Sequence, residues 1–387
     1  MRHTIKERFI GLVWSCLVLL SLSQPAQAVI SQTRPLNEAP IKVVFISVDI
    51  KYWFWEYLLD VLKEAAEDLN IDLEVLGAER DHIRYKETAL NVLKRAIPPD
   101  YLIIGNEKES AAAIIEASNT SRTKVFLINN GFVSKRNSSK FAETSPTYPQ
   151  WIGQVIPDNF HAGYESGKAL LQEAHKAFPS TTIQMLAFSG AHNTHASNER
   201  VRGLHSAIAE SKAVDLLQTV SADWNGTLAE KKAVALLGRY QVVHAIWSAN
   251  DEMAIGTLHG AVRAGYVPGK NLFISSTGWS KPAVEEVSKG TLVASLGGHF
   301  LDSAWALAMI YDRQHGEKGL NMNEHSKFIR MDASNVSVLG RFMKERLWHQ
   351  FDFKQWTHVH NPHLTSYETE QRKLIFASVR QDKKLRK

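Results

Sequence analysis

Apolar residues recur along the chain as short continuous runs and as helical stripes, and the two kinds of pattern alternate. Residues 42–47 read Lys-Val-Val-Phe-Ile-Ser, a β-branched run typical of a buried strand, and residues 57–69 place leucines on one side of a helix. Further strands are predicted at 72–76, 101–104, 124–128 and 151–155, with helices at 88–96 and 111–117 and another that begins at Asn159 or Phe160. This alternation predicts an α/β fold with a parallel, doubly wound sheet and right-handed crossovers.

A second series with the same rhythm begins at residue 183. It predicts strands at 183–188, 214–220, 242–247, 272–276 and 291–296, and helices at 197–210, 227–239, 252–264, 282–289 and 303–315. Between the two series, residues 133–150 are rich in Ser, Thr, Lys and Pro and are predicted to form an exposed loop. Two successive runs of one architecture indicate two similar lobes rather than one large sheet.

The character of the chain changes after about Ser334. Residues 338–349 are predicted to form an amphipathic helix, and the polar segment after Thr365 is expected to wrap the surface or fray. Between them lies a stretch rich in aromatic residues and histidine. Its three neighbouring histidines fit a loop better than a zinc site, because a proline lies among them: His358, His360 and His363.

The first 28 residues are predicted to be a cleaved signal peptide. Three basic residues precede the apolar run 9–22, and residues 26–28 read Ala-Gln-Ala, which fits a cleavage site. The apolar run is short for a membrane span. Cys16, the only cysteine, lies inside this run, so the mature chain is expected to have no disulfide and no thiol chemistry. We therefore expect a soluble protein exported to the periplasm.

Composition narrows the possible partners. The 387 residues are 44% hydrophobic and 22% charged, as in ordinary globular proteins, and the net charge is only +5. The body of the chain has no block rich in lysine and arginine, so nucleic-acid binding is not expected.

Aromatic residues follow the first predicted strand. Ligands of open α/β sheets bind beyond the carboxyl ends of the strands. Tyr52 is followed by Trp53, Phe54 and Trp55, and a helix cannot bury four consecutive side chains on one face. Some of these rings are expected to stack on a flat polar ring such as a sugar; the alternative is a packing cluster between the lobes.

Polar residues follow several other strands. Asn250 and Asp251 end the strand at 242–247 and begin a helix, where both are good N-caps, and a cap alone is the simpler interpretation. Arg200 falls in the first turn of a helix, where a cation opposes the helix dipole, so either a ligand or an ordinary surface position is possible. The other candidates at strand ends are Asn129, Asn130, Trp224, Trp279 and His299. A plain turn is the alternative for the asparagine pair, and a structural role is the alternative for His299.

Signatures of catalysis are missing from the sequence. The chain has no Gly-x-Ser-x-Gly elbow, no phosphate-binding loop, no Gly-x-Gly-x-x-Gly after the first strand and no His-Glu-x-x-His. Aromatic and amide side chains instead follow nearly every strand of both series. They predict a site for a small polar molecule between two lobes, without a metal or cofactor and without enzymatic activity.

The chain resembles the type I periplasmic binding proteins, the ribose-binding family whose fold also serves LacI-type repressors. The resemblance covers about residues 42–331. Its motifs are residues 248–256 (Ser-Ala-Asn-Asp-Glu-Met-Ala-Ile-Gly), 198–204 (Asn-Glu-Arg-Val-Arg-Gly-Leu), 155–159 (Val-Ile-Pro-Asp-Asn) with Gly163, and 289–295 (Lys-Gly-Thr-Leu-Val-Ala-Ser). It implies two lobes joined by a three-segment hinge. One lobe would comprise 40–156 with 298–328, the other 157–297 with 329–334, and an extension would follow at 335–387.

The resemblance also implies roles for the candidate residues in a cleft that closes over its ligand. Trp53 with Phe54 or Trp55 would supply the aromatic surface of the first lobe. Arg200 and Asn250 would contact the sugar, and Trp224 would cover its ring. Gly298 or His299 stands near the position of a glutamine in the family. Two departures make the expected site more aromatic and more neutral than a ribose site: Asn129-Asn130 replaces an Asp-Arg pair, and Trp279 or Gly278 stands where an aspartate is frequent.

Two membrane partners agree with this resemblance. In the first, the protein acts as a monomer and presents a sugar-like solute to the permease of an ABC transporter. In the second, it is a ligand sensor that signals through a histidine kinase or a cyclic-dinucleotide enzyme, as the autoinducer-2 receptor does. Asp251 keeps three possible roles at this stage: it could start the helix, orient Arg200 or contact the ligand.

Overall fold

The computed structural model describes residues 39–141 and 147–385. The predicted signal peptide and its cysteine lie outside the described residues. Residues from Pro40 onward form one unit that contains two six-stranded sheets. In the described part of the chain, no helix is both long and apolar enough to cross a lipid bilayer.

The first sheet has the strand order β11-β5-β4-β3-β1-β2, and all its strands are parallel. Its strands are β1 (Ile41–Ser47), β2 (Ile71–Gly77), β3 (Tyr101–Ile104), β4 (Lys124–Ile128), β5 (Trp151–Val155) and β11 (Asn323–Glu324). Its helices are α1 (Trp53–Asp68), α2 (His82–Leu93), α3 (Ala111–Ser118) and α10 (Asp302–Gln314). We call this sheet with its helices the first lobe.

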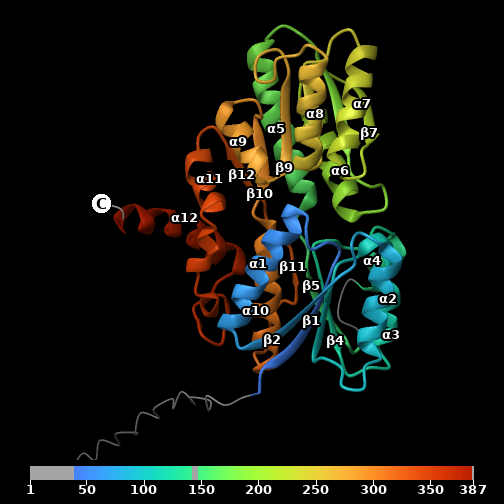
Figure 1. Ribbon diagram of the computed structural model, residues 1–387, viewed down its shortest axis with the longest axis vertical. Coiled ribbons are helices and arrows are strands. Elements are labelled where there is room, and N and C mark those ends of the chain that lie inside the picture. Colours follow the sequence, from blue (N-terminus) through green and yellow to red (C-terminus); the bar gives the residue numbers. More distant parts are fainter. Residues whose placement is uncertain (1–38, 142–146, 386–387) are drawn as a thin grey trace, which may run out of the picture. The chain divides into compact units, whose positions relative to one another are not determined.

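Both faces of the first sheet are buried, which explains why its strands are continuous apolar runs. Alternate residues of β1 point to opposite faces. Val43 and Phe45 pack in the cluster that includes α1 and α10, whereas Val44 and Ile46 pack with α2 and α3. Figure 1 shows α1 and α10 on one side of this sheet and α2 and α3 on the other.

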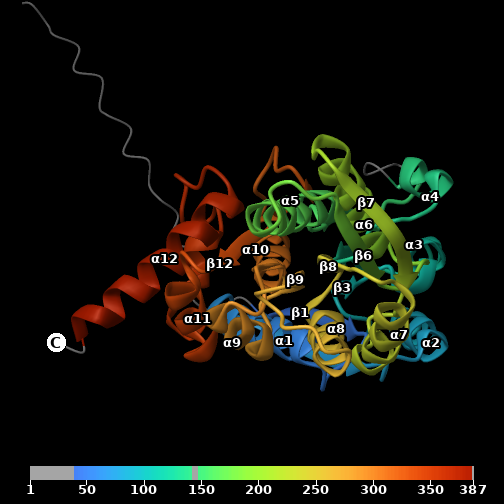
Figure 2. The same ribbon diagram turned by 90° about the horizontal axis from the view of Figure 1, so that it is seen from above.

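The second sheet has the order β12-β10-β9-β8-β6-β7 and is parallel except for β12, which pairs antiparallel with β10. Its strands are β6 (Ile183–Ser189), β7 (Val214–Ser221), β8 (Ala245–Ser248), β9 (Phe273–Gly278), β10 (Ala294–Gly297) and β12 (Ile329–Asp332). Its helices are α5 (Asn159–Ala177), α6 (His195–Glu210), α7 (Gly226–Arg239), α8 (Asp251–Arg263) and α9 (Lys281–Lys289). Figure 2 shows α5 and α6 on one face and α7, α8 and α9 on the other. This is the second lobe.

The chain crosses between the two sheets three times. The crossings lie between β5 and α5, between β10 and the 3₁₀ turn η2 (His299–Leu301), and between β11 and β12. The first and third crossings run side by side, because Ile156 N donates to Glu324 O at 2.9 Å and Asp158 N donates to Ser326 O at 2.8 Å. The prediction of two doubly wound parallel sheets joined by a three-segment hinge is confirmed.

Most predicted strands and helices occur within a few residues of their expected bounds, but five segments differ. Helix α2 begins at His82 rather than at residue 88 and ends at Leu93 rather than at residue 96. Helix α1 begins at Trp53, so the aromatic run is helical from its second residue. The expected loop at 133–150 contains the short helix α4 (Lys135–Lys140). Helix α11 (Val336–Lys344) is shorter than predicted, since Arg346 adopts a left-handed φ of 48°. The segment expected to wrap or fray forms the 19-residue helix α12 (Tyr367–Leu385).

The extension after β12 packs on both lobes. Helix α11 lies against α9, while the turns η3 (Leu347–Gln350) and η4 (Phe353–Trp356) lie against α1 and α10. The buried Trp348 ring contacts the rings of Tyr57 and Phe300, with centroids 5.6 and 5.3 Å away. Figures 1 and 2 show α11 and α12 on the side of the second lobe that carries β12 and α9. The core therefore continues from both lobes into the extension.

Candidate functional site

A cavity of about 200 Å³ lies where carboxyl ends of strands from both lobes meet. Nine predicted site residues line it: Trp53, Phe54, Trp55, Asn129, Asn130, Arg200, Trp224, Asn250 and His299. Tyr52, the first residue of the predicted aromatic run, lines it as well. Other lining side chains that the sequence patterns did not single out are Arg80, Glu107, Lys108, Asp223 and Thr277. The volume suits a ligand smaller than a typical drug.

Close packing of α5 on α6 positions Arg200. A Cβ added to Gly163 of α5 would lie 1.8 Å from Arg200 O, and one added to Gly203 of α6 would lie 2.0 Å from Phe160 O. Only glycine permits this approach, which brings the first residue of α5 beside the Arg200 side chain. Arg200 Nε donates to Asn159 Oδ1 at 2.9 Å.

The Arg200 guanidinium is buried and reaches from α6 to the end of β8. Its Nη1 donates to Ala249 O at 2.8 Å, and its central carbon lies 5.8 Å from the Trp224 ring centre. Burial lowers the pKa of Arg200 to about 10, so the side chain remains a cation at neutral pH. It presents a fixed positive charge in the wall of the cavity.

Asn250 is both a helix cap and part of the cavity wall. Its Oδ1 accepts a hydrogen bond from Met253 N at 3.0 Å, which caps α8. The same bond turns Nδ2 toward the first lobe, where it donates to the Tyr52 hydroxyl at 3.4 Å. Across the cavity, Asn130 Oδ1 accepts from Ala196 N at 3.3 Å. These two hydrogen bonds connect the lobes.

Aromatic rings form much of the wall. Phe54 stacks on the His299 ring, with centroids 4.7 Å apart. Burial, helped by the nearby Arg200 charge, lowers the pKa of His299 well below its usual value, so the imidazole is neutral. Trp224 lies directly over Gly190, where an added Cβ would be 2.2 Å from the indole ring. Trp53 reaches the second lobe, where a Cβ added to Gly278 would lie 2.7 Å from its ring.

Asp251 does not line the cavity. It is fully buried at the start of α8, where Oδ1 accepts from the hydroxyls of Ser276 at 2.5 Å and Ser295 at 2.8 Å. Its Oδ2 accepts from Ser280 N at 2.7 Å. These bonds fix the ends of β9 and β10 to α8, which is a structural role, so Asp251 is not included among the proposed ligand contacts.

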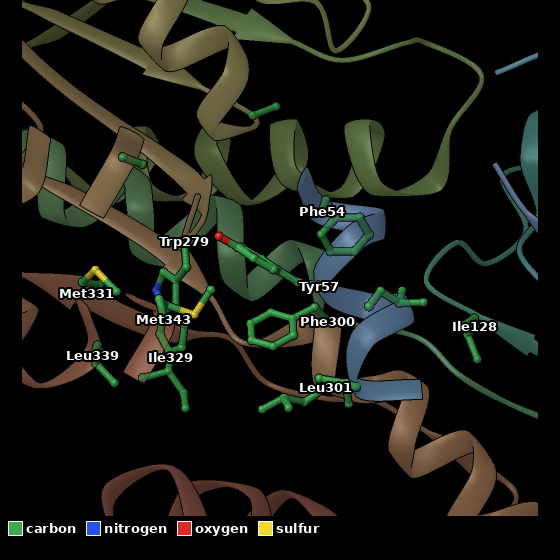
Figure 3. Packing of buried hydrophobic residues seen from close by; sticks show 14 of the residues in the cluster. Phe54, Tyr57, Ile128, Trp279, Phe300, Leu301, Ile329, Met331, Leu339 and Met343 are labelled. Carbon is green, nitrogen blue, oxygen red and sulfur yellow. The ribbon is translucent and has the colours of Figure 1, made fainter. Parts of the chain in front are cut away.

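Trp279 also lies away from the cavity. Its φ of 72° turns the ring into the second lobe, where it lies over Gly297 and Nε1 donates to Ser295 O at 3.1 Å. Figure 3 shows Trp279 in the buried cluster that also contains Met331 and Met343. Gly278, the alternative named with it, does line the cavity.

The charges around the cavity are mixed. Arg80 and Lys108 are exposed and extend from the first lobe, and the exposed Asp223 extends from the second. Burial raises the pKa of Glu107, and Lys108 acts against this shift. Among the described residues, no group of three or more His, Cys, Asp or Glu side chains is arranged to hold a metal ion.

Residues 42–318 match the family described as periplasmic binding protein domain. The chain is similar to the ribose import binding protein RbsB of Haemophilus influenzae, with 24% identity over 245 residues, which are 63% of this chain and 75% of that protein. RbsB of Salmonella typhimurium is 23% identical over 243 residues, covering 63% of this chain and 75% of that protein.

Solved structures show the same similarity. The crystal structure of a periplasmic sugar-binding protein from Pseudomonas fluorescens is 30% identical, with a TM-score of 0.77, and the alignment covers 87% of this chain and 99% of that one. The Caulobacter myo-inositol-binding protein, bound to myo-inositol, shares the fold at 17% identity, with a TM-score of 0.66 and coverage of 79% and 97%. With two matching sheets, three crossings and a family match over most of its length, the chain belongs to the periplasmic binding proteins.

Proposed function

We propose that this protein is exported to the periplasm, captures a sugar-like ligand between its lobes and presents it to the permease of an ABC importer. The observation that carries the proposal is the cavity itself. Aromatic rings, three asparagines and one buried arginine converge on it from strand ends of both lobes. Rings that stack and amides that both donate and accept are the groups that bind a polyhydroxylated ring.

The relatives support this proposal. They include ribose import binding proteins and a sugar-binding protein, and one structure of this fold contains myo-inositol. Residues 1–28 would be the export signal and would be removed from the mature protein. The protein would bind its ligand without converting it.

Ligand binding can be tested by thermal shift followed by calorimetry, with a panel of sugars and polyols. We expect one of them to raise the melting temperature and to bind with one-to-one stoichiometry. Arg200→Gln should weaken that binding about 10- to 100-fold, because a hydrogen bond from a charged donor is lost. Arg202→Gln is the matched control, since Arg202 lies in the same helix but is exposed and paired with Glu199.

Two results would contradict the proposal. Unchanged affinity in a folded Arg200→Gln variant would show that the ligand binds elsewhere. If no compound of the panel bound, sugar capture would be excluded as the function. The partner is tested separately, by adding ligand-loaded protein to the reconstituted ABC complex and measuring ATP hydrolysis. Stimulation supports uptake, whereas an effect only on a membrane kinase would favour the sensor role.

A further inference from the structure

We propose that the ligand is a sugar acid, a polyhydroxylated molecule with one carboxylate, and that Arg200 binds this carboxylate. The inference rests on the proposed function and goes further by naming the charge of the ligand. It follows from an imbalance of charge inside the cavity.

Arg200 is a buried cation without an ion pair. Only 5% of its surface is exposed, and its hydrogen bonds go to two neutral oxygens, Asn159 Oδ1 and Ala249 O. No residue that the structure describes forms a salt bridge with it or accepts a hydrogen bond from Nη2. Buried charges in proteins are normally paired, and a guanidinium has five N–H donors in a fixed fork that matches a carboxylate. The Nη2 group of Arg200 is therefore a hydrogen-bond donor in the cavity wall without an acceptor among the described residues.

Asp251 does not neutralise this cation by contact. Its two oxygens are bound by Ser276, Ser295 and the backbone of Ser280, and it lies outside the cavity wall. Its field acts on Arg200 only from a distance, and burial raises the pKa of Asp251, which disfavours its charged form. The carboxyl group of Asp251 is thus already bound by other groups.

The remaining charges of the wall lie toward its exposed rim. Arg80, Lys108 and Asp223 are exposed, and Glu107 is half-buried. Arg80 lies over the Tyr52 ring, 5.5 Å from its centre, and neither Arg80 nor Lys108 is paired with a residue in the described ranges. The wall therefore holds three cations (Arg80, Lys108, Arg200) against two carboxylates (Glu107, Asp223), and Arg200 is the one of the three cations that is buried.

None of the described lining residues around Arg200 carries a negative charge, and Asp251 and Glu252, whose charges act on Tyr52, do not line the cavity. The groups around Arg200 are a neutral imidazole, asparagine amides and aromatic rings. Burial raises the pKa of Tyr52 well above its usual value, so its hydroxyl stays neutral. The single buried positive charge of Arg200 corresponds to a monoanion, which favours a carboxylate over a phosphate dianion.

The test compares matched pairs on the full protein by calorimetry: glucose with gluconate and glucuronate, galactose with galactonate and galacturonate, ribose with ribonate, and each sugar with its phosphate. We expect at least one acid to bind about 10- to 100-fold more tightly than its neutral partner, since the carboxylate gains a charged hydrogen bond. The preference should shrink in Arg200→Gln, persist in part in Arg200→Lys and remain complete in Arg202→Gln.

Each outcome decides a different point. A neutral sugar that binds as tightly as its acid overturns the inference but leaves the proposed function intact. Tighter binding of a phosphate also overturns it, because the anion would then be the wrong class. No binding of any compound contradicts the proposed function itself. Because the preference is measured first on the unsubstituted protein, the test does not depend on the folding of an Arg200 variant.

Discussion

Several residues around the cavity adopt backbone conformations that most side chains avoid. Arg80, Lys108, Asn129, Asp223 and Trp224 have φ angles of 63°, 44°, 67°, 49° and 61°. Each follows the carboxyl end of a strand and lines the cavity. Left-handed backbone outside glycine persists where the surrounding structure enforces it, and it clusters at binding sites. The backbone thus supports the same location for the site as the side chains do.

A second feature at this scale is the buried carboxyl of Asp302, next to the crossings. Ser326 Oγ donates to its Oδ2 at 2.6 Å, and burial raises the pKa of Asp302 well above its usual value. The folded protein therefore binds a proton that the unfolded chain releases near pH 4. Asp302 therefore contributes fully to the free energy of unfolding when the pH is below its pKa in the unfolded chain. That contribution is lost as the pH rises through its pKa in the folded protein.

We therefore expect Asp302→Asn to reduce the loss of stability between pH 4.5 and pH 8. Each pKa unit of difference corresponds to about 1.4 kcal/mol. Urea unfolding at several pH values measures the slope. Asp332→Asn is the control: hydrogen bonds from Ser334 and the charge of Arg330 outweigh burial and lower the pKa of Asp332, so its contribution is lost only in more acidic solution. An equal slope in wild type and Asp302→Asn would contradict the prediction.

Which residues end a strand could be predicted, but which way they point could not. Phe54, Arg200 and Asn250 were expected in the cavity because they follow strands, and the structure places them in its wall. Trp279 also follows a strand, yet its ring turns inward over Gly297, since its φ is positive. Asp251 is held by serines from two other strands. Such partners are distant in sequence, so a local pattern does not reveal them.

At the scale of helices and strands, hydrophobic periodicity predicted the two sheets well and the extension poorly. Strands β3, β4 and β5 have the expected bounds. Helix α12 was missed because its buried stripe is sparse and partly polar, with Tyr367, Gln371, Ile375 and Val379 at every fourth position. Gln371 can be buried at a polar position because its Nε2 donates to Gly298 O at 3.0 Å. The burial of this helix therefore depends on a hydrogen-bond partner outside it, which the periodicity of apolar residues does not show.

The contact between α5 and α6 yields a prediction at this scale. Gly203→Ala should destabilise the protein by about 1–3 kcal/mol, because the new methyl group would meet the backbone at Phe160 and force the helices apart. The shift should also weaken ligand binding, since Arg200 lies one turn earlier in α6. Chemical unfolding and calorimetry measure the two effects.

Gly238→Ala is the control for this substitution. Gly238 also lies in a helix, α7, but an added Cβ there would have no atom within 4 Å. Alanine should be neutral or stabilise the helix by up to about 1 kcal/mol. If Gly203→Ala proved as stable as Gly238→Ala, close packing of α5 on α6 would not be what positions Arg200.

At the scale of the whole chain, the extension is part of the core rather than an appendage. It contacts α9 of the second lobe through α11 and contacts α1 and α10 of the first lobe through η3 and η4. Trp348 donates from Nε1 to Asp60 Oδ2 at 2.9 Å, and Arg346 pairs with Asp60 and Glu56 of the same helix. The family match ends at residue 318 and does not include this segment. These contacts give the segment a structural role.

We expect Trp348→Ala to cost about 3–5 kcal/mol, as for other large residues removed from a core, and to lower the melting temperature in one cooperative transition. Trp348→Phe should cost less, because it keeps most of the ring contacts and loses mainly the bond to Asp60. Calorimetric and circular dichroism melting curves compare the variants. A loss below 1 kcal/mol for the alanine variant would show that the extension adds little to the fold.

The distribution of indoles has a practical consequence. Trp53, Trp55 and Trp224 line the cavity, whereas Trp151, Trp247, Trp279, Trp305, Trp348 and Trp356 are fully buried. Water and small quenchers such as iodide can therefore reach the cavity indoles but not the buried ones. A bound molecule would shield the accessible group and shift its emission, while the buried group serves as an internal reference. The unlabelled protein thus contains its own optical reporter of cavity occupancy.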